Sequence, residues 1–176
     1  MRRLVGALLF FLSFTAQATT TPLGFSAGPI FKLNGMGDGL LATLGGRING
    51  SYGYFLFGLG GYGAVAQSKI VLGKKGENVS YSYGGLGLGV RFFPQSFIHI
   101  TNYNTFGLGK LDLKNQGQSG LAYSIEPELN LEIDIFSTLR IGTGLSYRFL
   151  FCQQVPPPTK ELSGLGWQFY VELGRI

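Results

Sequence analysis

LAYSIEPELNLEIDI, the stretch from Leu121 to Ile135, divides its residues into two sets at alternate positions. The odd positions are apolar throughout: Leu121, Tyr123, Ile125, Pro127, Leu129, Leu131, Ile133 and Ile135. The even positions include four acids: Glu126, Glu128, Glu132 and Asp134. Because successive side chains of a β-strand point to opposite faces, this alternation predicts a strand with one apolar and one acidic face. It is far longer than the usual strand of roughly five or six residues, which suits a wall between lipid and a polar interior.

The composition agrees with a closed sheet of such strands. The chain has 176 residues with 29 glycines, 14% aromatic residues and only 13% charged residues. Glycine relieves crowding where the strands of a small barrel bend or approach closely. After the first residues, no apolar run reaches the length of about 20 residues that a membrane helix needs, so a membrane-spanning form must be a closed sheet. Cys152 is the only cysteine, which excludes an internal disulfide.

The first residues have the pattern of a secretory signal peptide. Arg2 and Arg3 form a positive start, Leu4 to Phe14 is apolar, and Ala16-Gln17-Ala18 is an A-x-A cleavage site. We therefore expect a signal peptide from Met1 to Ala18 and a barrel domain over 19–176. Loss of the two arginines lowers the formal net charge from +5 to +3, which gives no indication of a nucleic-acid partner.

Alternation elsewhere predicts eight strands in all, joined as an all-β, antiparallel, up-and-down transmembrane barrel. They cover 23–33, 40–49, 54–67, 81–93, 97–113, 121–135, 139–152 and 162–175. The connections after the second, fourth and sixth strands are tight turns. The first, Asn34 to Gly39, is modest, and the others are polar loops: Ser68 to Ser80, Lys114 to Gly120 and Gln153 to Glu161. This asymmetry is expected of a bacterial outer-membrane barrel with both termini in the periplasm.

The fifth predicted strand has an irregular apolar face. Ile98, Ile100, Phe106 and Leu108 share that face, but so do Asn102 and Asn104. Either a bulge shifts the register, or the apolar band stops near Ile100.

Charged residues gather on the opposite faces of the predicted strands. Inward positions hold Lys32, Arg47, Arg91, Arg140 and Arg148 against Glu126, Glu128, Glu132, Asp134 and Glu172. The interior of an eight-stranded barrel is only wide enough for its own side chains, and buried charges must be paired. We predict a structural network of ion pairs that fills the lumen, since an ion path needs a wider barrel.

Candidate chemistry is sparse. His99 and Thr101 share a strand face, so a base and a hydroxyl nucleophile lie close together, faintly similar to the His-x-Ser-Asn stretch of lipid A deacylases. No acidic partner is evident downstream on the same face, so we predict a structural histidine and no catalytic residue. No ligand spacing predicts a metal site, and the glycine patterns lack the helix of a phosphate loop, so no cofactor is expected.

The second half of the chain resembles a family of small, mostly uncharacterised bacterial outer-membrane barrels with OmpA/OmpX-like eight-stranded architecture. The residues that carry the resemblance are Tyr83-Gly84-Gly85-Leu86-Gly87-Leu88, Pro94, Ile98-His99, Ile125-Glu126-Pro127, Asn130, Glu132, Arg140-Ile141-Gly142, Tyr147-Arg148-Phe149, Leu162-Ser163-Gly164 and Gly174-Arg175-Ile176. The resemblance implies an outer-membrane location and this fold, with no established ligand. Expected partners are outer-membrane lipid, the barrel insertion machinery and an extracellular partner bound through the loops.

The leading hypothesis is a non-enzymatic outer-membrane barrel with a packed, charged lumen and an envelope or surface-interaction role. Three alternatives remain: a lipid-modifying enzyme that uses His99, a small pore, and a soluble periplasmic barrel that binds an apolar ligand. The soluble barrel reverses the two faces, which places Leu129 inside and Glu128 and Glu132 in water.

Overall fold

The computed structural model describes residues 23–65, 68–72, 75–152 and 162–175. The strands are β1 (Gly24–Met36), β2 (Gly39–Tyr52), β3 (Phe55–Ala64), β4 (Ser68–Leu72), β5 (Lys75–Phe92), β6 (Ile98–Leu113), β7 (Gln118–Phe136), β8 (Leu139–Cys152) and β9 (Gly164–Arg175). The predicted signal peptide, Met1 to Ala18, and the predicted loop Gln153 to Glu161 lie outside the described residues. Within the described ranges, no helix is long and apolar enough to cross a membrane.

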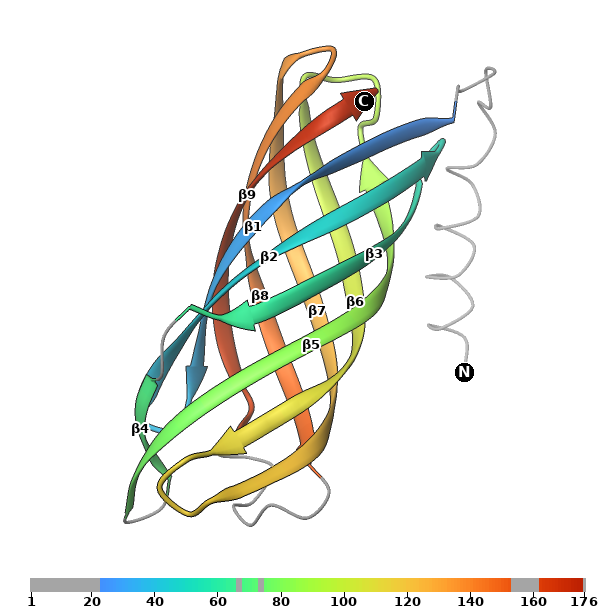
Figure 1. Cartoon of the computed structure of the whole chain (residues 1–176). Coiled ribbons are helices and arrows are strands. Elements are labelled where there is room, and N and C mark those ends of the chain that lie inside the picture. Colours follow the sequence, from blue (N-terminus) through green and yellow to red (C-terminus); the bar gives the residue numbers. More distant parts are fainter. Residues whose placement is uncertain (1–22, 66–67, 73–74, 153–161, 176) are drawn as a thin grey trace, which may run out of the picture.

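The strands form one closed antiparallel sheet (Figure 1). The order is β3-β2-β1-β9-β8-β7-β6-β5-β4, and a further pairing of β3 with β5 closes the ring. β3 and β4 both pair with β5, at successive stretches of its length, so together they fill one position in the wall. The barrel therefore has eight positions around its circumference and an up-and-down topology, as predicted.

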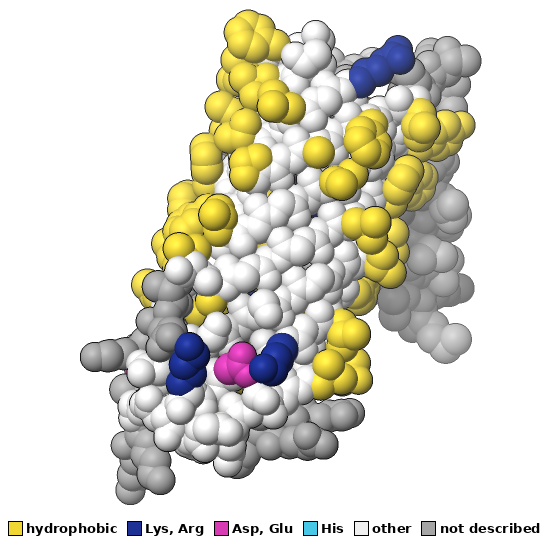
Figure 2. Space-filling view, in the orientation of Figure 1, with side chains coloured by type: hydrophobic (Ala, Val, Ile, Leu, Met, Phe, Trp, Pro, Cys, Tyr) yellow, Lys and Arg dark blue, Asp and Glu magenta, His cyan; other side chains and the backbone are white. Residues whose placement is uncertain are grey.

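The long strand predicted from Leu121 to Ile135 is the central part of β7, and its two faces separate as expected. The side chain of Leu129 is 57% exposed on the outer surface, whereas Glu128 is 2% exposed and faces the lumen. Apolar side chains are exposed along both sides of the face in Figure 2, with backbone and other side chains between them. This orientation contradicts the soluble-barrel alternative, which required Leu129 inside and Glu128 in water.

Three predicted connections differ from the structure because strands continue through them. The modest first connection, Asn34 to Gly39, is a two-residue turn at Gly37 and Asp38. The predicted loop Ser68 to Ser80 contains β4 and the beginning of β5, which pair with each other. The predicted loop Lys114 to Gly120 is confined to 114–117, and it ends at Gly117 with φ of 62°. Polar composition alone indicated loops here, but the backbones satisfy their hydrogen bonds as paired strands.

The barrel has two different ends. The end that carries the connections 53–54, 93–97 and 137–138 is called the turn end. The end that carries 37–38, the β4–β5 hairpin and 114–117 is called the loop end. In Figure 1 the loop end lies at the bottom, and β5, β6 and β7 reach beyond β1 there.

Inside the loop end, the lumen is apolar. A buried cluster, here called the apolar cap, includes Met36, Leu41, Val79, Leu111, Leu113, Leu150 and Leu162. On β6, Lys110 and Asp112 face outward between these leucines, so the polarity of the two faces is reversed relative to the middle of the strand. The prediction of a charged lumen is thus too broad for the part of the chain that the structure describes, where the buried charged groups lie in the middle and at the turn end.

The register of β6 is regular, contrary to both predicted irregularities. Its pairing with β5 and β7 continues without a bulge from Ile100 to Leu113. Apolar residues resume on the outer face at Phe106 and Leu108 after Asn102 and Asn104. The two asparagines therefore lie on the outer surface between apolar residues.

Candidate functional site

The strongest cluster of charged side chains is the lumen network in the middle and turn-end parts of the barrel. It joins five cations, Lys32 of β1, Arg47 of β2, Arg91 of β5, and Arg140 and Arg148 of β8. It also joins five acids, Glu126, Glu128, Glu132 and Asp134 of β7, and Glu172 of β9. β7 supplies four of the acids because its inward positions recur every second residue.

Glu128 is the centre of the network. Its Oε1 accepts hydrogen bonds from Lys32 Nζ at 2.7 Å and from Thr105 Oγ1 at 3.1 Å. Its Oε2 accepts from Gln168 Nε2 at 2.8 Å and from Arg47 Nη1 at 3.2 Å. A carboxylate with four donors and no contact with water is a fixed structural charge, not a group free to bind a ligand.

Glu126 and Glu172 extend this central cluster to either side. Lys32 Nζ also donates to Glu126 at 3.2 Å, and Arg148 donates to the same carboxylate from Nε and Nη2, both at 3.1 Å. Arg47 Nη2 reaches Glu172 at 3.2 Å, and Asn49 Nδ2 donates to it at 2.7 Å. The chain Arg148–Glu126–Lys32–Glu128–Arg47–Glu172 thus alternates in charge and is neutral.

A second cluster lies toward the turn end. Glu132 accepts from Arg91 Nε at 3.1 Å and from Tyr170 OH at 2.7 Å. Arg140 lies between the two acids of this cluster, 3.6 Å from Glu132 and bound to Asp134 by two hydrogen bonds of 2.6 and 2.9 Å. Two arginines thus face two carboxylates, and this cluster is neutral apart from His99.

His99 has the acidic partner that the sequence did not reveal. Its Nε2 lies 2.8 Å from Asp134 Oδ2, and its Nδ1 lies 2.9 Å from the backbone oxygen of Phe93. Both neighbours are acceptors, so both contacts are hydrogen bonds only when both ring nitrogens carry protons. Neither nitrogen is free to take a proton from Thr101, whose buried Oγ1 has no hydrogen-bond partner among the described residues. The geometry holds the turn before β6 against β7 and does not form a nucleophile–base pair.

Aromatic rings shield the cations of the central cluster. Arg47 lies over the rings of Tyr103 and Tyr170, with 4.3 and 5.0 Å between its guanidinium carbon and the ring centres. Arg148 lies over Tyr83 at 5.0 Å, and the rings of Tyr62 and Tyr83 stack 4.7 Å apart. Cation–π contacts of this kind stabilise desolvated cations. Rings and ion pairs together fill the width of the lumen.

The sequence placed all ten charged residues of the network on inward faces, and the structure brings them into contact in two clusters. Sequence reasoning assigned no uncharged partner to the network. These partners are His99, which was predicted only to be structural, and Ser26, Asn49, Tyr83, Tyr103, Thr105, Gln168 and Tyr170. Each of them occupies an inward position of its strand, so strand parity was the signal that could have found them.

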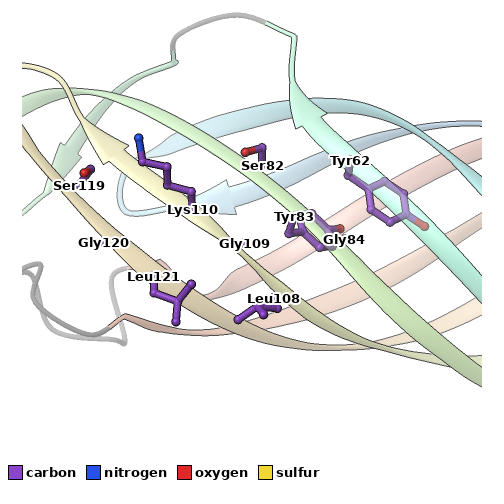
Figure 3. Close-up of a pocket in the computed structure, with 10 residues that line it drawn as sticks. All are labelled: Tyr62, Ser82, Tyr83, Gly84, Leu108, Gly109, Lys110, Ser119, Gly120 and Leu121. Carbon is purple, nitrogen blue, oxygen red and sulfur yellow. The ribbon is translucent and has the colours of Figure 1, made fainter.

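A shallow groove on the outer wall is a second candidate site (Figure 3). Its lining includes Gly84, Gly109 and Gly120 together with Leu108, Lys110 and Leu121. Lys110 is already paired with Asp112 at 2.9 Å. The described residues contain no group of acids, histidines or cysteines placed to hold a metal ion. The groove thus offers bare backbone and apolar walls, without a set of reactive groups.

Comparisons with known proteins agree on the fold. No family model and no curated protein match the sequence. The crystal structure of Neisserial surface protein A (NspA) is similar with a TM-score of 0.62 and 10% identity, over 88% of this chain and 97% of that one. The crystal structure of Ail, the attachment invasion locus protein of Yersinia pestis, is similar with a TM-score of 0.50 and 12% identity, over 86% and 97%. The chain thus has the fold of a closed, eight-stranded, antiparallel up-and-down β-barrel, similar to these two structures.

Proposed function

We propose that the protein is a sealed, non-enzymatic barrel of the bacterial outer membrane that presents its loop end at the cell surface. The observation that carries the proposal is the double closure of the lumen. Ion pairs and aromatic rings fill its middle, and the apolar cap fills its loop end. Ions and hydrophilic solutes have no polar path through the apolar cap, because its side chains cannot replace their hydration.

A surface role is supported by the loop end itself. There β5, β6 and β7 continue as paired strands beyond the outward apolar residues, with Lys110 and Asp112 on the outside. This projection is polar on its outer side, which suits recognition by water-exposed partners. The two similar barrels are named as a surface protein and an attachment invasion locus protein, in agreement with such a role. Export through the signal peptide Met1 to Ala18 and assembly by the barrel insertion machinery are parts of the same proposal.

Orientation and location are tested by labelling single cysteines on intact cells. In a Cys152→Ser background, Ser119→Cys places a thiol on the outer wall at the loop end, and Ser137→Cys places one in the turn between β7 and β8. A membrane-impermeant maleimide is expected to label Ser119→Cys on intact cells and Ser137→Cys only after lysis. The reverse pattern, or recovery in the soluble fraction, overturns the proposal.

Closure is tested by planar-bilayer recordings of the purified barrel. The expected record is flat under conditions in which a general porin gives conductance steps. Discrete steps that survive further purification favour the pore instead.

The absence of lipid A modification is tested by mass spectrometry. Lipid A from cells with the wild-type chain or His99→Ala is expected to have the same mass spectrum as lipid A from cells that lack the protein. A new lipid A species that disappears with His99→Ala favours the enzyme.

A further inference from the structure

The outer face of β6 has two polar residues inside its apolar belt. Ile98 and Ile100 precede them and Phe106 and Leu108 follow, all exposed on the outer wall. Asn102 and Asn104 occupy the two outward positions between. Their Cα partners on the neighbouring strands are Val90 and Leu88 of β5 and Leu129 and Pro127 of β7, none of which has a polar side chain.

The pair lies at the centre of the belt. From Ile98 to Leu108 the strand makes ten residue steps, and the next outward residue is the charged Lys110. At about 3.3 Å per residue and a tilt of about 40°, these steps rise about 25 Å, which is the usual height of the lipid-facing band. Asn102 and Asn104 therefore lie on either side of the midpoint of this belt, one residue step from it.

The two amides satisfy each other only in part. Asn104 Nδ2 donates to Asn102 Oδ1 at 3.1 Å. Within the described part of the chain, no hydrogen bond reaches Asn102 Nδ2 or Asn104 Oδ1. Acyl chains offer neither donors nor acceptors, so these atoms are costly against lipid and favour a partner that brings polar groups to the same depth.

We propose that this face of β6, with its flanks on β5 and β7, is the interface of a homodimer in the membrane. All copies insert in one direction, so the dimer axis runs along the membrane normal and every residue meets the partner at its own depth. The asparagine pair then faces the asparagine pair of the second copy. A carboxamide has two N–H donors and an oxygen that accepts twice, so at equal depth Asn102 Nδ2 of each copy can donate to Asn102 Oδ1 of the other, and Asn104 Nδ2 to Asn104 Oδ1. Leu88, Val90 and Leu129 surround these bonds with apolar contacts.

The first test compares three proteins in liposomes: wild type, Asn102→Leu/Asn104→Leu, and Thr143→Val as the matched control. Thr143 is a polar outward residue on β8, two strands from β6 and opposite Leu131 of β7, so its loss removes a polar group from the wall without removing a residue named for the interface. Single-molecule photobleaching over a range of protein-to-lipid ratios gives the dimer fraction. We expect the protein-to-lipid ratio at which half of the copies are dimeric to be about tenfold higher for the double variant than for wild type. For Thr143→Val this ratio is expected to match that of wild type. Wild type that stays monomeric throughout, or a double variant that dimerises equally, overturns the proposal.

Cross-linking provides a test that leaves both asparagines intact. In a Cys152→Ser background, Leu88→Cys flanks the interface, and Leu44→Cys lies on the wall of β2 with similar exposure, 54% against 58% for Leu88. A short bifunctional maleimide is expected to give a product of twice the chain mass in cells from Leu88→Cys only. Equal products from both positions overturn the proposal, as does a Leu88→Cys product of another mass, which indicates a different membrane protein at this face. An unboiled gel shows that each variant is a folded barrel.

Discussion

Glu128→Gln removes the charge at the centre of the lumen network while it keeps the size of the side chain. The carboxylate accepts from Lys32, Arg47, Thr105 and Gln168. An amide has one oxygen, and its NH2 group must face one pair of these donors. The central cluster then holds three cations and two acids, out of reach of water. Loss of one partner from a buried ion pair costs about 3–5 kcal/mol, so we expect the free energy of unfolding to fall by that amount.

The assay is reversible urea unfolding in lipid bilayers, followed by the fluorescence of Trp167, the only tryptophan. Asp112→Asn is the matched control, because Asp112 pairs with Lys110 at the surface, and its loss is expected to change stability by less than about 0.5 kcal/mol. Adding Lys32→Met to Glu128→Gln restores the balance to two cations and two acids, since Glu126 keeps Arg148. The double variant should therefore be more stable than Glu128→Gln alone. If Glu128→Gln costs less than about 1 kcal/mol, or if the two substitutions are simply additive, the lumen charges are not coupled and the reasoning fails.

Two further substitutions test the outer wall and the closeness of the strands. Leu129→Lys, in the middle of the lipid-facing belt, is expected to lower the free energy of unfolding by about 2–4 kcal/mol in the same assay. Ser119→Lys, beyond the belt, is expected to lower it by at most about 1 kcal/mol. Equal losses would place the membrane elsewhere. Gly28→Ala puts a Cβ into the carbonyl oxygen of Val171 on β9, so we expect a loss of about 1–3 kcal/mol. Gly61→Ala meets nothing within 4 Å and should leave stability unchanged, and a similar loss at both glycines would contradict the packing.

The fold was readable from the sequence because membrane strands carry their environment in their alternation. Along β7 every odd residue from Leu121 to Ile135 is apolar, and a shift by one residue would put Glu128 and Glu132 into lipid. The same constraint fixed the inward faces of β1, β2, β5, β8 and β9, and with them the ten charged residues of the network. A narrow lumen then leaves these charges little choice but to pair with one another.

Pairings between particular residues were not readable, because they depend on the register between strands. His99 is opposite Glu132 in the register of β6 and β7, yet its ring reaches Asp134, two residues further along. The other ring nitrogen of His99 contacts the backbone oxygen of Phe93 in the turn 93–97, where Phe93 has φ of 57°, an uncommon value for a residue with a side chain. The alternation of β6 shows which face His99 occupies, but carries no information about this turn.

The loop end was wrongly predicted as loops for a related reason, which is that the polarity of the two strand faces is exchanged there. A strand that leaves lipid for water must exchange the polarity of its two faces, since its outer side becomes hydrated and its inner side needs an apolar core. On β6 the exchange falls between Leu108 and Lys110, after which Leu111 and Leu113 turn inward beneath the polar outer face. On β5, Val79 and Tyr81 are buried while Ser80 and Ser82 face outward. Such segments are rich in polar residues and resemble loops in composition, yet their alternation persists with the opposite phase. On β5 and β6 the position of that reversal marks where the outer face changes from apolar to polar, and under the proposed membrane location it is the expected lipid boundary at the loop end.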